Sequence, residues 1–278
     1  MAAGEATSLR ADSPVSQDST RITTFTESSF FKERPTWKLP SPAEIRALNK
    51  ESGNRRAEEL SRPSPVTVPS LGLFVKYGAD VTVAEVETQI RMRELLQGRV
   101  PIPEVFGWAD DGGQRFIYMS LVDGDTLQAR WGGMSEGERV AVCQELRSMV
   151  AAWRALPQEG CEPYVGSLGQ RRLNDILLWY RPNFAGPFLG ADAVSQFHDA
   201  CGIMIDENVP ITFAHADICP PNVLLTEGAD PKVASVIDWG QAGWYPSYWE
   251  NCKRGWWTPS LISSTLVYRR SGIPSMSR

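Results

Sequence analysis

The chain has 278 residues, 42% of them hydrophobic and 22% charged, and a formal net charge of -5. This length and apolar content suffice for a domain with a sizeable core, and the acidic balance excludes a broad basic surface for nucleic acid or anionic membranes. The sequence has five cysteines without paired spacing, no apolar run of about 18 residues and no N-terminal signal segment. We therefore expect a reduced cytoplasmic protein with neither nucleic-acid nor membrane partners, and composition leaves its oligomeric state open.

The N-terminal part of the chain changes character near residue 30. Residues 1–30 are rich in Ser, Thr and Ala and lack apolar periodicity, which predicts disorder. A capping box then follows, with Ser41 as N-cap, Pro42 at the first helical position and Glu44 three residues after the cap. These residues predict a short helix over 41–49.

A single cation marks the next element, the apolar strand predicted over 71–77, which carries Lys76. A helix is predicted over 83–96. At about 100° per residue, Glu87 borders the apolar face of this helix, whereas Glu85 points nearly opposite. We therefore expect Glu87 to pair with Lys76. The alternative is that both glutamates are solvated surface charges and that the lysine only marks a strand end.

Further elements follow in the middle of the chain. Two apolar runs over 105–108 and 115–119 flank turn residues and predict a hairpin. A second capping box at Ser135 opens a helix predicted over 135–156, and another helix is predicted over 191–201.

The most informative stretch runs from residue 215 to residue 239. It contains Asp217, then Asn222 five residues later, then Asp238 after an apolar run. Two β-prone runs, 223–225 and 233–237, are separated by turn-forming residues and predict a hairpin. Asn222 would begin one strand and Asp238 would end the other, which brings the two side chains to neighbouring positions.

Phosphoryl transfer from ATP requires this set of groups: a carboxylate that orients the acceptor hydroxyl, and an amide and a carboxylate that hold Mg²⁺. Asp217, Asn222 and Asp238 match that order and spacing. Two other interpretations are a zinc site that includes His215 and Cys219, which has no matching second pair of ligands, and ordinary turn and strand-end residues. We expect His215 to brace the loop through hydrogen bonds and Cys219 to be a small buried residue.

At these residues the chain resembles the aminoglycoside phosphotransferase and choline kinase group of small-molecule kinases, and in particular a fungal-type branch with the run 236–246. The resemblance covers residues 40–253. It implies an α+β, bilobal protein-kinase-like fold, with a small antiparallel-sheet lobe over 31–120 that binds nucleotide and a mainly helical catalytic lobe over 121–253. The divergent tail, 254–278, is short and Ser-rich, which predicts a C-terminally shortened or divergent member with an incomplete acceptor pocket.

The resemblance also implies the roles of individual residues. Asp217 corresponds to the catalytic base, and Asn222 and Asp238 correspond to the Mg²⁺ ligands. The residues implied for ATP binding hold the phosphates or form the hinge that contacts adenine, and they are Lys76, Glu87, Met119, Ser120 and Val122. Met119 is as readily explained as a core residue.

Two departures from the family pattern stand out. Ala216 occupies the position where the family has Gly or Asp. Residues 61–70, where a Gly-rich phosphate loop is expected, contain Pro and no Gly. Phosphate binding would then depend on Lys76, Mg²⁺ and a few backbone amides.

The sequence thus predicts an ATP- and Mg-dependent phosphotransferase that acts on a hydroxyl group of a small molecule. The alternative is a non-catalytic kinase-like protein that binds nucleotide or a partner, which the absent Gly-rich loop and the short tail favour. A protein kinase is disfavoured because no Ala-Pro-Glu element follows Asp238. Aminoglycosides, choline-like amines, sugars and other alcohols all remain candidate acceptors.

Overall fold

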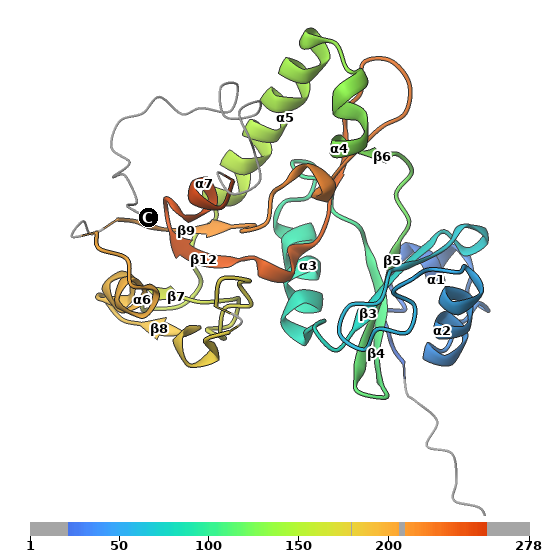
Figure 1. Ribbon diagram of the computed structural model, residues 1–278, viewed down its shortest axis with the longest axis horizontal. Coiled ribbons are helices and arrows are strands. Elements are labelled where there is room, and N and C mark those ends of the chain that lie inside the picture. Colours follow the sequence, from blue (N-terminus) through green and yellow to red (C-terminus); the bar gives the residue numbers. More distant parts are fainter. Residues whose placement is uncertain (1–21, 179, 206–208, 255–278) are drawn as a thin grey trace, which may run out of the picture.

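The N-terminal lobe is built on a five-stranded antiparallel sheet with the order β1-β4-β5-β3-β2. Figure 1 shows it in the computed structural model, which describes residues 22–178, 180–205 and 209–254. The strands are β1 Thr23–Thr24, β2 Val66–Val68, β3 Leu73–Gly78, β4 Val105–Asp111 and β5 Gln114–Ser120. The predicted strand over 71–77 and the predicted hairpin are therefore both confirmed.

Regular structure is present in this lobe before residue 31, where the sequence indicated disorder. Disorder was expected for residues 1–30, but Thr23 pairs with Trp108 of β4, and Phe30 in α1 (Ser29–Glu33) is buried against Phe106 with ring centroids 5.3 Å apart. The expectation is wrong for residues 22–30, because a few aromatic side chains anchor a segment too short to show periodicity. Residues 1–21 lie outside the described residues.

Two helices of this lobe pack against its sheet. The predicted capping box at Ser41 is present at the start of α2 (Pro42–Glu51), where the Glu44 carboxylate accepts a 2.7 Å hydrogen bond from the Ser41 N–H. Helix α3 (Val83–Leu95) begins after Thr82, whose hydroxyl accepts from a backbone N–H in the first turn. In Figure 1, α3 lies between the sheet and the C-terminal lobe, so side chains on its first turns can reach both.

The C-terminal lobe packs around the long helix α5 (Glu136–Arg154). Its predicted capping box, Ser135 with Glu138, is present, and its fully buried Trp153 packs edge-on against Trp239 with centroids 5.6 Å apart. The remaining elements of this lobe are β6 Asp125–Thr126, α4 Leu127–Arg130, β7 Tyr164–Val165, β8 Phe188–Leu189, α6 Ala193–Cys201, β9 Ile211–Ala214, β10 Val223–Leu225, β11 Val233–Val236, β12 Gly243–Pro246 and α7 Trp249–Arg254.

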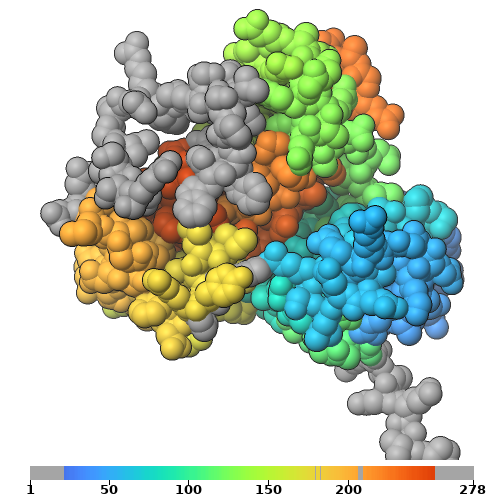
Figure 2. All heavy atoms as spheres, viewed as in Figure 1, coloured from blue at the N-terminus to red at the C-terminus, as the bar shows by residue number. Residues whose placement is uncertain are grey.

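The expected fold class is confirmed: an antiparallel-sheet lobe and a larger lobe dominated by helices make an α+β, two-lobed, kinase-like molecule. Figure 2 shows the N-terminal lobe in blue and cyan beside the yellow-to-orange mass of the C-terminal lobe. We propose that the two lobes divide at residue 120, where β5 ends. None of the helices in the described ranges is long and apolar enough to cross a membrane. The predicted divergent tail lies outside those ranges from residue 255 onward.

Candidate functional site

A β-hairpin in the C-terminal lobe brings two polar side chains together, as the sequence predicted. Strands β10 and β11 pair in antiparallel fashion with Val223 opposite Val236. Asn222 lies directly before β10, Asp238 lies just after β11, and the Ile237 N–H donates a 3.0 Å hydrogen bond to the Asn222 carbonyl. The hairpin therefore holds both side chains at the same end.

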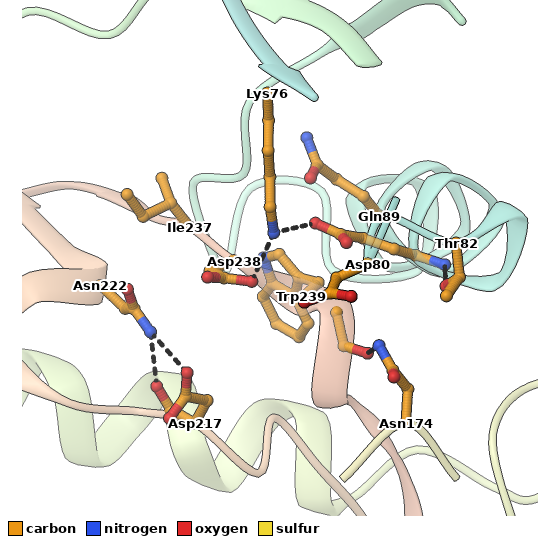
Figure 3. A network of polar contacts seen from close by, with 12 residues as sticks. Lys76, Asp80, Thr82, Gln89, Asn174, Asp217, Asn222, Ile237, Asp238 and Trp239 are labelled. Atoms are coloured by element: carbon orange, nitrogen blue, oxygen red, sulfur yellow. Dashed lines mark hydrogen bonds and ion pairs between the residues drawn. The ribbon is translucent and has the colours of Figure 1, made fainter. Parts of the chain in front are cut away.

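The third member of the set, Asp217, joins them from the preceding loop. The Asn222 amide donates from Nδ2 to the Asp217 carbonyl (2.9 Å) and to its Oδ2 (3.1 Å). Figure 3 shows these two residues facing each other, with Lys76 pointing toward Asp238 beside them. All four side chains line one cleft with a volume of about 610 Å³, so residues distant in the chain converge on one cavity.

His215 holds this loop in place through hydrogen bonds, as expected. Its ring is fully buried; Nδ1 accepts a 3.2 Å hydrogen bond from the Asp217 N–H, and Nε2 lies 3.1 Å from the Ile237 carbonyl. A neutral imidazole with its proton on Nε2 satisfies both contacts at once. Because one ring bonds to the loop of the first aspartate and to the residue before Asp238, it fixes the two loops relative to each other. Cys219 is a buried small residue beside them, also as expected.

Replacing His215 with Asn should flatten the dependence of stability on pH. Burial lowers the pKa of His215 to about 4, although the Asp238 carboxylate opposes this effect. Between that value and the ordinary 6.5, the unfolded chain binds a proton that the folded chain does not. The free energy of unfolding should therefore fall as the pH drops below 6.5, by about 2 kcal/mol at pH 5.

Urea unfolding of the wild type and of His215→Asn at pH 7.5 and pH 5 measures this contribution. Other acidic groups titrate in both proteins, so the difference between their pH dependences isolates the histidine. An equal loss of stability in the two proteins on acidification would show that His215 does not stay neutral in the fold.

Lys76 pairs with Glu85, which corrects the prediction that Glu87 is its partner. The Lys76 ammonium bonds to a carboxylate oxygen of Glu85 and lies 2.8 Å from Oδ1 of Asp238. Glu85 is only 3% exposed, whereas Glu87 is half exposed and forms an ion pair with Arg171 of the other lobe. The lysine therefore ties the first turn of α3 to the end of the β10–β11 hairpin.

The prediction that Glu87 pairs with Lys76 was wrong because it assumed that the apolar face of α3 is the face toward Lys76. The side chains that face the cleft from α3 are polar, namely Glu85 and Gln89 one turn later, and both are buried. The helix is thus covered on its polar side by the 3-10 turn η5 (Trp239–Gln241). A Cβ at Gly240 of this turn would lie 2.9 Å from Glu85 Oε2, so the glycine makes room for the carboxylate.

Burial and the charges of neighbouring side chains set the pKa values of the ionisable residues in the cleft. Burial alone would lower the pKa of Lys76, but Glu85 and Asp238 outweigh it and raise that pKa. Burial raises the pKa of Glu85 against the pull of Lys76, whereas for Asp238 the lysine overcomes burial and lowers the pKa. Burial, and secondly the Asp238 carboxylate, raise the pKa of Asp217 to about 6. The cleft therefore holds two carboxylates that pair with one lysine, Glu85 and Asp238, and a third, Asp217, that gains a proton more readily than an ordinary aspartate.

The residues expected to form the hinge lie at the same cleft. Met119, Ser120 and Val122 all line it, and Met119 is buried with its sulfur 3.5 Å from Nε2 of Gln89. The Ser120 N–H donates to the Glu104 carbonyl at 2.8 Å. The Ser120 N–H is therefore already used within the N-terminal lobe. The roles of these three residues stay predictions.

Sequence reasoning missed Glu250, which holds the loop from α7. Its buried carboxylate accepts from the N–H of His215 at 2.8 Å and from that of Ala216 at 3.1 Å. Ala216 has a φ of 60°, in the left-handed region where a side chain costs about 1 kcal/mol. The two charge-assisted bonds offset this cost. No local signal marks Glu250, because its partners lie 34 and 35 positions earlier in the chain.

Comparisons with known proteins agree with this geometry. The model of a family described as "Phosphotransferase enzyme family" matches residues 70–250. An aminoglycoside 3'-phosphotransferase of Streptomyces fradiae is 26% identical over 162 residues, which cover 55% of this chain. The chain spans 57% of the length of that curated relative.

Solved structures with similar folds include two aminoglycoside phosphotransferases. One is the apo form of a thermostable mutant of aminoglycoside phosphotransferase APH(4)-Ia, with a TM-score of 0.49 and 19% identity over 73% of this chain and 71% of the other. Another is aminoglycoside phosphotransferase APH(3'')-Id of Streptomyces rimosus in complex with ADP and streptomycin. Its TM-score is 0.47, with 17% identity over 84% of this chain and 94% of the other.

Proposed function

Because the chain belongs to the phosphotransferase enzyme family, we propose that it transfers the γ-phosphate of ATP, in the presence of Mg²⁺, to a hydroxyl group of a small molecule. The observation that carries this proposal is the convergence of Asp217, Asn222, Asp238 and Lys76 on one cleft. These groups match the catalytic carboxylate, the two metal-binding side chains and the phosphate-binding lysine that such transfer requires. The similarity to the aminoglycoside 3'-phosphotransferase of Streptomyces fradiae supports phosphate transfer to a small molecule.

The donor set fits Mg²⁺. This ion prefers oxygen ligands and is usually held by one or two protein groups together with substrate phosphates. The Asp238 carboxylate and the Asn222 amide oxygen would supply those two groups. Within the described part of the chain, no three His, Cys, Asp or Glu side chains gather to hold a metal, so the zinc interpretation finds no support there. Bound Mg²⁺ would neutralise charge on the phosphate oxygens.

The remaining side chains would position the reactants. Asp217, held by Asn222, would orient the acceptor hydroxyl and accept its proton. Lys76, fixed by Glu85, would neutralise the phosphates. Catalysis would then come mainly from positioning and from charge stabilisation within the cleft. All five cysteines lie in the described ranges and are free thiols, which suits our proposal of a cytoplasmic location.

A panel screen tests the proposal. Purified protein with Mg·ATP would be incubated with aminoglycosides, amino alcohols, sugars and other alcohols, and ADP release would be measured against the same reactions without acceptor. Phosphorylation of one compound class, identified by mass spectrometry, is the expected result. Mg·ATP binding without transfer to any acceptor would favour the non-catalytic alternative, and absence of nucleotide binding would overturn both.

Glu85 and Glu87, two residues apart on α3, offer a matched pair of variants. Glu85→Gln should weaken Mg·ATP binding by about tenfold, because the Lys76 ammonium loses a charged and buried partner. Glu87→Gln removes the same charge two residues away and should change the affinity by less than about twofold, since its ion pair with Arg171 is exposed. Isothermal titration of both variants decides the point. The reverse order of effects would restore Glu87 as the functional partner.

A further inference from the structure

Residues 60–65, which we call the strap, lie where a Gly-rich phosphate loop was expected. The strap is attached to the end of β3 through its backbone. The Leu60 carbonyl accepts from the Ala79 N–H at 2.9 Å and from Nε2 of Gln114 at 3.0 Å, and the Ser61 carbonyl accepts from the Asp80 N–H at 3.2 Å. These bonds hold the strap against the sheet.

The contact between the strap and β3 is too close for a side chain. Gly78, the last residue of β3, has a φ of 146°, and a Cβ there would lie 2.2 Å from the Ser61 carbonyl oxygen. Such a position accepts only glycine. The next strap residue, Arg62, then forms an ion pair between its Nε and Oδ2 of Asp80 at 2.8 Å. Both the backbone and the guanidinium of the strap are therefore held in place.

The strap faces the site described above. Four of its residues line the same cleft as Lys76 and Asp238, and they are Ser61, Arg62, Pro63 and Pro65. The positive charge of Arg62 also reaches the buried Glu85: burial raises the pKa of that carboxyl, and both Lys76 and Arg62 oppose the rise. The guanidinium charge of Arg62 thus favours the ionised form of Glu85, the carboxylate that pairs with Lys76.

The composition of the strap changes how it can bind an anion. Gly-rich loops bind phosphates through consecutive backbone N–H groups. Pro63 and Pro65 have no N–H, so the strap cannot offer such a series. An arginine can bind an anion in a different way, because its guanidinium carries a permanent positive charge and a planar set of N–H donors.

We infer that Arg62 contacts the phosphate groups of the bound nucleoside triphosphate and replaces the backbone amides of a Gly-rich loop. The inference rests on the proposed function, because it concerns the same nucleotide. Arg56, which also lines the cleft, adds positive charge on the same side. The charges of Arg62 and Lys76 approach the phosphates from two different segments, the strap and β3.

Isothermal titration with ATP and with adenosine tests this inference. Arg62→Gln should weaken ATP binding by about tenfold or more, as expected for loss of a charge-assisted contact, and should leave adenosine binding unchanged. Arg62→Lys should recover part of the loss, because it restores the charge without the planar fork. Arg55→Gln is the matched control: Arg55 is a nearby exposed arginine outside the cleft lining, and ATP affinity should change by less than about twofold.

A purely structural role for Arg62 would give a different pattern. Asp80→Asn removes the ion pair but keeps the guanidinium, so ATP affinity should stay within about threefold of the wild type. Two results would overturn the inference. One is that Arg62→Gln loses affinity for ATP and for adenosine equally, and the other is that Asp80→Asn binds ATP as weakly as Arg62→Gln does. A wild type that transfers phosphate while Arg62→Gln binds ATP normally would overturn the inference alone. A wild type that does not bind Mg·ATP would overturn the proposed function as well.

Discussion

An Asp217→Asn variant is expected to lose phosphate transfer by about a thousandfold, the scale of an essential general base, while it still binds Mg·ATP. The substitution keeps the size and shape of the side chain but removes its ability to accept a proton. The Asn222 amide, which donates to both the carbonyl and Oδ2 of Asp217, can keep its bond to the carbonyl. The fold and the nucleotide site should therefore survive, so that the loss appears in the transfer step.

Single-turnover transfer to the acceptor found in the panel screen, together with titration of Mg·ATP, separates the two properties. Asp230→Asn is the matched control, because Asp230 lies in the exposed turn of the β10–β11 hairpin with a φ of 53° that asparagine tolerates. It should retain full activity. Transfer at the wild-type rate in Asp217→Asn would remove the residue from the catalytic role.

The second large effect is expected for Asp238→Asn, which should weaken Mg·ATP binding itself, by about a hundredfold. Its carboxylate is the proposed Mg²⁺ ligand and also a partner of Lys76 at 2.8 Å. Asn is preferred over Ala as the replacement because Asp238 has a φ of 64°, a left-handed conformation that asparagine adopts readily. The variant therefore tests the charge and not the backbone.

The dependence on metal distinguishes the two functions of Asp238. The wild type should bind ATP more tightly with Mg²⁺ than in the presence of EDTA, and Asp238→Asn should lose most of that difference. Thermal unfolding without nucleotide is the control for folding, since Lys76 keeps its bond to Glu85. An unchanged advantage of Mg²⁺ in the variant would show that the metal binds elsewhere.

The contacts of Lys76 connect the two lobes, which is why we expect these substitutions to affect binding and transfer separately. Lys76 belongs to the N-terminal sheet, and Asp238, 162 positions later, belongs to the hairpin that also carries Asn222. The geometry of the proposed nucleotide-binding groups therefore depends on the relative position of the lobes. Asp217 and His215, in contrast, are fixed within the C-terminal lobe by Asn222 and by Glu250.

The motif from Asp217 to Asp238 could be read from the sequence because its geometry is local. The two β-prone runs form a hairpin whose register places Val223 opposite Val236, so the residues flanking these strands must be neighbours. The capping boxes at Ser41 and Ser135 were likewise predictable, since each depends on residues three positions apart. The antiparallel sheet around Lys76 followed from short apolar strands and turn residues.

The tertiary structure alone decided the partner of Lys76, the support of the loop by Glu250 and the position of Arg62. Helical periodicity orients a helix correctly only where its interior side is apolar, and α3 buries the polar side chains of Glu85 and Gln89 at the cleft that also holds Lys76. Glu250 bonds to backbone groups 34 and 35 positions earlier in the chain, and Arg62 bonds to Asp80 in the turn after β3. Sequence determined which chemical groups this protein carries and the local hairpin that pairs them; the packing of the lobes determined which of those groups face the cleft.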